Sequence, residues 1–288
     1  MKSMSGAPLM FRIAKRMARS RIRGASFLMR RLEDLGMLNV IAQYQLGRVQ
    51  FCVPLSRFQW DLRDIESYEV KLINTFCRAV APLNMVTLFD CGADIGTFSS
   101  LVCHRTEQIA KIFAFEPNLD VHEFLQRNLS NLPVPSQMIP KAVSNFNGRG
   151  LLERADYDPS DHARFLLPGD GPIEVTTIDS MNVRDGDIAI KLDVEGGELN
   201  TLKGAVETIL SARQCVVTVE AHPAVARRTG QDPIECLLFL KSLRPFHFVV
   251  AETGEHPLMT APLLRTQQTE VWNIVGSTYS ERGLPSFK

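Results

Sequence analysis

The chain has 288 residues, of which 45% are hydrophobic, enough for one sizeable α/β domain with an extension. Lys and Arg number 32, as do Asp and Glu, and a net charge of zero does not indicate general nucleic-acid binding. The six cysteines show no C-x-x-C pair or zinc spacing, which indicates a reducing, cytoplasmic compartment. No apolar run is long enough to span a membrane, and no secretory h-region stands out.

The basic residues are concentrated at the N-terminus. Residues 1–31 hold nine Lys and Arg and no Asp or Glu, with apolar residues near helical spacing. This pattern fits a solvated basic tail or a helix packed on the domain, a helix on an anionic membrane surface, or a mitochondrial transit peptide. We expect a mostly helical extension over residues 1–64, with a short strand and turn around Pro54, and leave membrane contact through 1–31 open. The main domain then covers 65–288 and begins with a helix over 65–80.

A strand, a glycine turn and a helix follow in order. Residues 85–89 are a short apolar run that suits a buried parallel strand, and residues 98–105 have helical apolar spacing. Between them, Asp90 stands at the strand tip and Gly92 and Gly96 stand in the turn. This is the first unit of a nucleotide-binding α/β sheet, whose ligand binds at the carboxyl ends of the strands.

Charge indicates which ligand this turn holds. A dinucleotide turn reads G-x-G-x-x-G and seats a pyrophosphate, but here Asp94 stands where a second glycine is expected. Asp90 and Asp94 would each repel a diphosphate by about 1 kcal/mol even in a fairly polar site. They would attract S-adenosylmethionine, which carries an ammonium and a sulfonium; the alternative is a tight turn with capping aspartates. The predicted cofactor contacts here are Asp90, Gly92, Ala93, Asp94, Gly96, Thr97 and Phe98.

The second predicted strand, residues 110–115, ends in Glu116, Pro117 and Asn118. Glu116 stands twenty positions after Gly96, where an acidic residue at the second strand tip can accept both hydroxyls of a ribose. The alternative is a solvated carboxylate at a strand end. Pro117 and Asn118 suit the start of a helix, and we count all three among the cofactor contacts.

Further along the chain, residues 136–143 form a third predicted strand, whose end near Ala142 should lie beside an adenine ring. Residues 145–172 are rich in Gly, Asp and Pro and are expected to form a long loop, either a lid or a mobile surface loop. Residues 173–178 are strand-like, and Asp179 is expected to cap the short helix after them.

The run D-I-A-I-K-L-D-V-E at 187–195 is the second stretch with chemical character. Residues 188–192 are strand-like, and Lys191, Asp193 and Glu195 point the same way in an extended chain. Charges that alternate at the tip of a buried strand indicate a site. A glycine pair then leads into a helix over 199–210.

The next strand, 214–219, again ends in an acid and a histidine, Glu220 and His222. A helix over 234–243 and strands over 246–251 and 270–276 complete the predicted α/β sheet.

These residues resemble the FkbM family of S-adenosylmethionine-dependent methyltransferases over about residues 86–277. The likeness rests on D-C-G-A-D-I-G-T-F-S, F-E-P-N, K-A-V-S, V-T-T-I-D-S, I-K-L-D-V-E-G-G-E and V-E-A-H-P. The resemblance implies the seven-stranded class I methyltransferase sheet, with an antiparallel last strand and helices on both faces. It also implies that the glycine turn, Glu116 and the residues near Ala142 line the cofactor. Residues 1–60 and 145–172 fall outside the match, so substrate choice does not transfer.

The family usually methylates oxygen, and the enzyme must chiefly hold the acceptor oxygen about 3 Å from the methyl carbon. His222 is the first candidate for the base, with a capping or turn histidine as the alternative. Asp193 or Glu195 would orient it or the acceptor, Lys191 stands at the same strand tip, and Asp193 also counts as a cofactor contact. A Mg²⁺-like ion held by Asp193 with Glu220 or His222 stays open, but the spacing does not require it and no metal is predicted.

By the resemblance, the acceptor is a hydroxyl of a glycan or glycolipid, or of a small molecule such as a secondary metabolite. Two other functions stay open. One is a methyltransferase-like domain that binds cofactor or a partner without turnover; the other, disfavoured by Asp94, is an NAD-linked oxidoreductase. Oligomeric state and membrane association are left open by the sequence.

Overall fold

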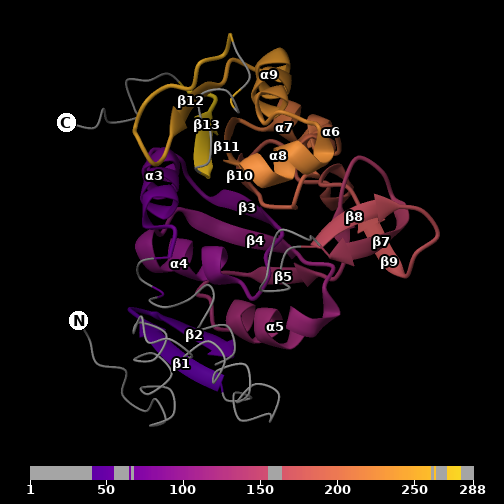
Figure 1. Cartoon of the computed structure of the whole chain (residues 1–288). Helices are drawn as coiled ribbons and strands as arrows, with labels where there is room; N and C mark the ends of the chain where they lie inside the picture. The colour runs from indigo at the N-terminus through magenta and orange to yellow at the C-terminus, as the bar shows by residue number, and fades with distance from the viewer. Residues whose placement is uncertain are drawn as a thin grey trace, which may run out of the picture.

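The computed structural model describes residues 41–54, 65, 68–154, 164–260, 263 and 271–279. Its centre is a sheet of seven strands: β3 (Val86–Cys91), β4 (Ile109–Phe115), β5 (Ser136–Ile139), β10 (Asp187–Leu192), β11 (Gln214–Ala221), β12 (His247–Val250) and β13 (Trp272–Ser277). The strand order is β12-β13-β11-β10-β3-β4-β5 (Figure 1). Only β13 runs antiparallel to its neighbours in this sheet. The predicted α/β sheet with an antiparallel last strand is confirmed.

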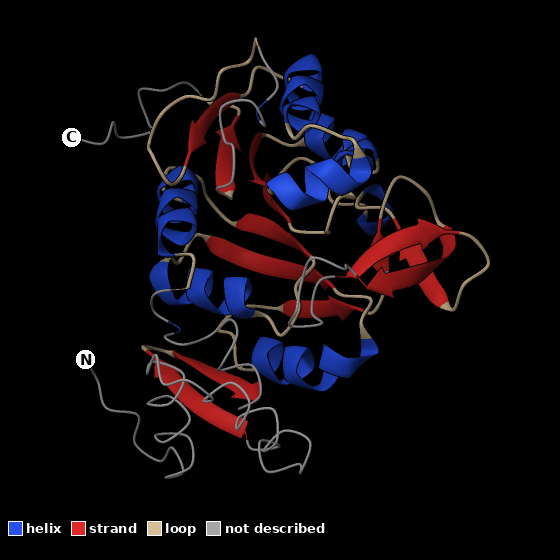
Figure 2. Cartoon of the chain, in the orientation of Figure 1, coloured by secondary structure: helices blue, strands red, loops and turns tan. Residues whose placement is uncertain are grey.

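Helices cover both faces of the sheet (Figure 2). On one face lie α3 (Val70–Val80), α4 (Thr97–Arg105) and α5 (His122–Ser130); on the other lie α6 (Glu198–Lys203), α7 (Val206–Ser211) and α9 (Ile234–Leu243). Neighbouring residues of one strand enter opposite clusters, because side chains alternate along a strand: Leu88 packs under α3 and α4, and Phe89 packs on the other side. Both faces are therefore buried, as the apolar strands predict.

Residues 41–54 form a hairpin of β1 (Ile41–Leu46) and β2 (Val49–Pro54), so a mostly helical extension does not hold for this part. The physical reason is the β-branched and aromatic residues Val49, Phe51 and Val53, which favour a strand and are all buried. The buried Asn128 of α5 ties the hairpin down, since its amide bonds both backbone groups of Cys52 at 2.7 and 2.8 Å. The expectations for residues 1–40 lie outside the described residues, and the boundary after residue 64 stays a prediction.

A second, smaller sheet corrects three expectations for residues 136–178. It consists of β6 (Ala142–Val143), β7 (Gly148–Arg154), β8 (Arg164–Pro168) and β9 (Ile173–Thr176), in the order β6-β9-β7-β8. Residues 136–143 are thus two strands, separated at Pro140, which has no N–H to continue a ladder. The strand at 173–176 joins the small sheet, not the main one, and segments of the expected 145–172 loop are β7 and β8.

The glycines that indicate a loop here serve close packing. A Cβ at Gly171 would collide with the backbone of Gly150, so the two segments approach as only glycine allows. The polar run 156–162 lies outside the described residues.

Two predicted helices differ from the structure in their bounds. The first begins at Val70 and not at residue 65, and the second divides into α6 and α7 around Gly204. A Cβ at Gly204 would collide with the carbonyl oxygen of Ser144, so the chain bends where it touches the small sheet. In the part of the chain that the structure describes, no helix combines the length and apolar character needed to cross a membrane.

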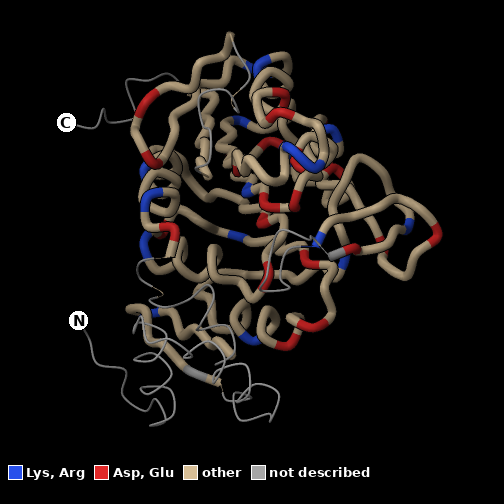
Figure 3. Tube along the Cα trace, in the orientation of Figure 1, with Lys and Arg blue, Asp and Glu red and all other residues tan. Residues whose placement is uncertain are grey.

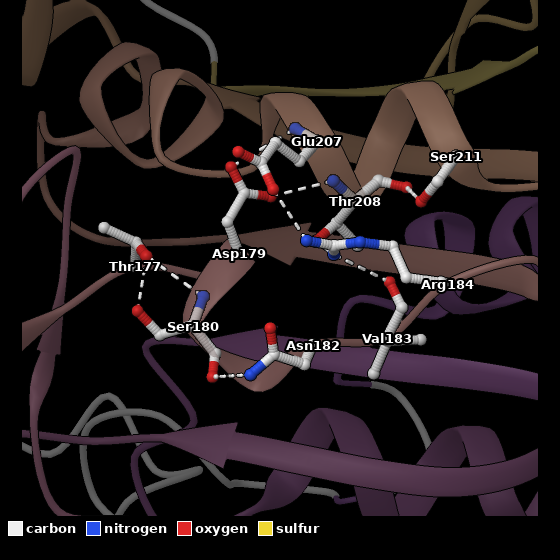
Figure 4. A network of polar contacts seen from close by, with 9 residues as sticks. All are labelled: Thr177, Asp179, Ser180, Asn182, Val183, Arg184, Glu207, Thr208 and Ser211. Carbon is white, nitrogen blue, oxygen red and sulfur yellow. Dashed lines mark hydrogen bonds and ion pairs between the residues drawn. The ribbon is translucent and has the colours of Figure 1, made fainter.

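The V-T-T-I-D-S motif connects the end of β9 to α7 through hydrogen bonds (Figure 4). Asp179 opens a short 3-10 helix, η4 (Asp179–Met181), but its carboxylate accepts the backbone N–H groups of Glu207 and Thr208 at 3.2 and 2.8 Å. It therefore caps α7, which begins 27 positions later in the sequence, at Val206. The sequence pattern predicts instead that it caps the short helix that directly follows it. Thr177 closes the turn locally, since its hydroxyl accepts the N–H of Ser180 at 3.1 Å.

Candidate functional site

A cavity of about 600 Å³ lies where β3, β4 and β10 end. The turns after these strands form one side, with Gly92, Asp94, Glu116, Asp193 and Glu195 among the lining residues. The small sheet forms another side through Leu152 and residues 164–168, and α8 (Pro223–Thr229) contributes Arg228 and Thr229. The volume is in the range of cavities that hold small ligands.

The glycine turn after β3 is packed tightly against its neighbours. Gly92 has a φ of 78°, and a Cβ there would collide with the carbonyl oxygen of Asp193. The N–H groups of Gly92 and Ala93 both donate to the carbonyl oxygen of Phe115, each at 3.0 Å. The turns after β3, β4 and β10 are therefore held together by backbone contacts, which fixes the positions of the side chains that follow.

Of the residues predicted from this turn, Gly92 and Asp94 line the cavity. Ala93, Gly96, Thr97 and Phe98 do not: Gly96 precedes α4 with a φ of 83°, and the other three are buried. Their role as direct cofactor contacts stays a prediction.

Asp90 lies behind the cavity in a buried ionic group. Its side chain is inaccessible to solvent; Oδ2 accepts the Ser99 hydroxyl at 2.6 Å, and Oδ1 lies 3.6 Å from Lys191 Nζ. Burial raises the pKa of Asp90. In this conformation Asp90 does not reach a ligand in the cavity, and it acts by holding Lys191.

Lys191 connects this buried group to the cavity. Its ammonium donates to the carbonyl oxygen of Gly92 at 2.8 Å and to Asp193 Oδ2 at 3.0 Å. Burial lowers the pKa of Lys191, but the carboxylates of Asp193 and Asp90 outweigh this and raise it, so the side chain stays a cation at neutral pH. Lys191 does not line the cavity, which makes it a positioning residue for Asp193.

Glu116 lines the cavity while only 8% of its surface is exposed. One carboxylate oxygen accepts the N–H of Asp94 and the other that of Asn118, both at 2.8 Å. Burial, followed by the charge of Asp94, raises the pKa of Glu116 to about 7. Each oxygen keeps a lone pair, so the carboxylate can accept two hydroxyl groups side by side. Pro117, Asn118 and Ala142 also line the cavity, as predicted.

The turn after β10 places Asp193 and Glu195 at the cavity. Glu195 adopts a φ of 54° and Gly196 a φ of 99°, where a Cβ would lie 2.7 Å from Thr229 Cγ2. The turn is therefore packed against α8, and Arg228 Nη2 donates to the carbonyl oxygen of Glu195.

His222 makes the capping contact that the sequence analysis gave as the alternative to a base. It is the N-cap of α8, and its Nδ1 accepts the N–H of Ala224 at 3.1 Å. Burial lowers the pKa of His222, which favours the neutral ring, and a neutral ring that accepts at Nδ1 carries its hydrogen on Nε2. Neither nitrogen then has a lone pair for a substrate proton. His222 also does not line the cavity.

Metal binding has no support in the described residues, which contain no group of three or more His, Cys, Asp or Glu placed to hold an ion. Several lining residues carried no motif and were missed: Tyr68, Arg164, Phe165 and Arg228. Tyr68 lies in the segment predicted as a helix over 65–80, and residues 164 and 165 of the small sheet lie in the segment predicted as a loop.

The charges of the lining test the predicted cofactor. Four carboxylates (Asp94, Glu116, Asp193 and Glu195) lie at the strand ends, where Figure 3 shows acidic positions gathered. This surface suits a ligand with positive groups and a ribose, and it would repel a diphosphate. The residues therefore fit S-adenosylmethionine.

The sheet order, the antiparallel strand and the acidic cavity at the strand ends define a class I methyltransferase. The chain belongs to the family described as the methyltransferase FkbM domain, whose model matches residues 90–244. The predicted family is confirmed, and the lining of the cavity fits the predicted cofactor, S-adenosylmethionine.

Similar proteins include a hexuronic acid methyltransferase from Haloferax volcanii, 28% identical over 186 residues that cover 63% of this chain and 74% of the relative. Among solved structures, a methyltransferase FkbM from Methylobacillus flagellatus KT is 15% identical, with 88% of this chain and 60% of that chain covered and a TM-score of 0.40. A SAM-dependent O-methyltransferase from Thermotoga maritima is 12% identical, with 87% and 82% covered and a TM-score of 0.40. The chain thus spans less than two thirds of the Methylobacillus protein.

Proposed function

We propose that this protein transfers a methyl group from S-adenosylmethionine to a hydroxyl of a sugar, in a glycan or a glycolipid. The observation that carries the proposal is the meeting of Asp94, Glu116, Asp193 and Glu195 at one cavity of about 600 Å³. The relative that acts on hexuronic acid supports a sugar as the acceptor.

The geometry supports the following cofactor contacts. Glu116 accepts the two ribose hydroxyls through its remaining lone pairs, and Asp94 and Asp193 offer negative charge to the ammonium and sulfonium. Ala142, Val143 and Ser144 border the cavity at the start of the small sheet, where the adenine ring is expected.

The bound cofactor would supply a methyl carbon that its sulfonium makes electrophilic: the sulfur–methyl bond breaks, an oxygen–methyl bond forms, and S-adenosylhomocysteine and a proton are released. Asp193 and Glu195 are the groups that we place next to the acceptor hydroxyl. A carboxylate there accepts the hydroxyl hydrogen bond, orients the oxygen and takes its proton. Lys191 holds Asp193 in position from behind, at 3.0 Å.

A methyl-transfer assay tests the proposal. The full chain is incubated with methyl-labelled S-adenosylmethionine and three sets of acceptors: neutral hexose glycosides, hexuronic acid glycosides and non-sugar alcohols. We expect label on a sugar oxygen, identified by mass spectrometry and NMR, with one S-adenosylhomocysteine per methyl group. Asp193→Asn and Glu195→Gln should lower kcat while S-adenosylhomocysteine affinity changes little for Glu195→Gln. Cofactor binding without transfer to any sugar would contradict the proposal and favour a silent binding domain.

A further inference from the structure

Two arginines face the same cavity as the four carboxylates. Arg164 comes from β8 of the small sheet and Arg228 from α8, whereas the carboxylates come from the turns after β3, β4 and β10. The described lining residues include no Lys and no His. The cavity is therefore divided into an acidic side, which suits the ammonium, sulfonium and ribose of the cofactor, and a basic side, which these three groups do not explain.

Arg228 is held in place by two elements. Its guanidinium lies 3.9 Å from the centroid of the Phe165 ring, in the small sheet, and Nη2 donates to the carbonyl oxygen of Glu195. A stacked and hydrogen-bonded guanidinium loses little further freedom when it binds an anion, because its orientation is already fixed. The contact with Glu195 also places it beside the carboxylates that we assign to the acceptor hydroxyl.

Arg164 adds a second positive group with unused donor capacity. Its Nη2 lies 3.1 Å from Asp120 Oδ2, on a carboxylate that is 74% exposed. Its Nε is buried and has no hydrogen-bond partner among the described residues. A buried donor without a partner is uncommon, because its desolvation is not compensated, and the positive charge of Arg164 remains at the cavity lining.

We propose that the acceptor is an acidic sugar, whose carboxylate is bound by Arg228 with Arg164 as a second cation. This rests on the proposed function and specifies its substrate class. In a hexuronic acid the carboxylate and the ring hydroxyls belong to one small ring, so one end can reach the arginines while a hydroxyl reaches Asp193 or Glu195. Guanidinium groups suit carboxylates because two N–H donors match two oxygens.

The test compares two acceptors that differ in one group: a hexuronic acid glycoside and the corresponding neutral hexose glycoside. Binding to the enzyme loaded with S-adenosylhomocysteine is measured by calorimetry, and kcat/KM is measured by methyl transfer. We expect the wild-type protein to prefer the acidic sugar by about 10- to 100-fold, the usual range for a hydrogen-bonded charged pair.

Arg228→Gln should lower this preference about 10-fold or more and change the neutral acceptor only a few-fold, and Arg164→Gln should lower it by a smaller factor. Arg228→Lys should keep part of it, since the charge remains but the paired donors are lost. Arg227→Gln is the matched control: Arg227 is exposed on the same helix, does not line the cavity and should leave the preference unchanged.

Four results would overturn the inference. Equal use of both sugars by the wild-type protein would leave the proposed function intact but remove the acidic substrate, and this comparison needs no variant to fold. Equal losses of kcat/KM for both acceptors in Arg228→Gln would show that Arg228 only stabilises the small sheet and does not bind the acceptor carboxylate. Weaker S-adenosylhomocysteine binding with an unchanged preference would assign Arg228 to the cofactor carboxylate. Methylation of no sugar at all would contradict the proposed function, and the inference with it.

Discussion

Glu116 is expected to weaken the fold at high pH while it serves the cofactor, and Glu116→Gln measures both effects. Burial and the charge of Asp94 raise the pKa of Glu116 from 4.5 to about 7, so the folded protein binds this proton more tightly than the unfolded chain. The resulting stability is fully present below the unfolded pKa and is lost as the pH rises through about 7. Between about pH 5 and pH 8 the loss is about 2.5 kcal/mol.

The assay is chemical denaturation of the wild-type protein and Glu116→Gln over this pH range. Other groups titrate in both proteins, so the difference between their unfolding free energies isolates Glu116. We expect the wild-type protein to lose about 2.5 kcal/mol relative to the variant from pH 5 to pH 8. The variant should also bind S-adenosylhomocysteine about 10-fold or more weakly, because hydrogen bonds to a carboxylate are the stronger ones.

Asp94→Asn is the matched control, since Asn tolerates the φ of 50° at this position. Removing the charge of Asp94 lowers the pKa of Glu116 and should shrink the pH-dependent difference. A difference that stays flat from pH 5 to pH 8 would refute the burial of Glu116 as an ionisable group and the electrostatic account of the cavity.

Three further predictions concern the elements around the cavity. Gly92→Ala should lower the unfolding free energy by more than about 3 kcal/mol, because the new Cβ collides with the Asp193 carbonyl. The control Gly230→Ala, at a φ of 71° with open space around it, should lower it by only about 1–2 kcal/mol. Equal losses in the two variants would contradict the close approach of Gly92 to Asp193. In denaturant titrations, Asp179→Ala should lower the unfolding free energy by about 1–2 kcal/mol, because α7 loses its cap. The control Ser211→Ala should lower it by less than about 0.5 kcal/mol. An unchanged unfolding free energy in Asp179→Ala would contradict the capping role of Asp179. His222→Asn should keep kcat within about three-fold of the wild-type value, since Asn also caps helices. His222→Ala should lower the unfolding free energy by about 1 kcal/mol, because the cap of α8 is lost. Loss of turnover in His222→Asn with intact S-adenosylhomocysteine binding would instead support His222 as the base.

The main sheet and the strand-end residues could be predicted because each rests on short-range signals. Apolar runs define the strands, and turn glycines and acids follow each run, which predicts that Glu116, Asp193 and Glu195 lie at one edge of the sheet, as the structure shows. The pattern could not show which of the charged residues are buried behind the cavity. Asp90 and Lys191 read as strand-tip charges like the others, but they pair with each other behind the cavity.

The small sheet was missed because its strands are short and separated by Gly and Pro, which also punctuate loops. The small sheet brings Arg164 and Phe165 to the cavity because β8 pairs with β7, β7 pairs with β9, and Phe165 contacts Arg228 of α8. These contacts join segments far apart in the sequence, so no local pattern predicts them. The V-T-T-I-D-S motif shows the reverse case. It is the specific part of the family resemblance, yet Thr177 and Asp179 do not line the cavity and join the end of β9 to α7.

Calorimetric titration of the full chain with S-adenosylmethionine, with NADH as the comparison ligand, tests the central claim most directly. The acidic cavity at the ends of β3, β4 and β10 predicts one bound S-adenosylmethionine per chain, weakened in Glu116→Gln, and no binding of NADH. Binding of NADH in its place, or S-adenosylmethionine binding that does not respond to Glu116→Gln, would contradict the account.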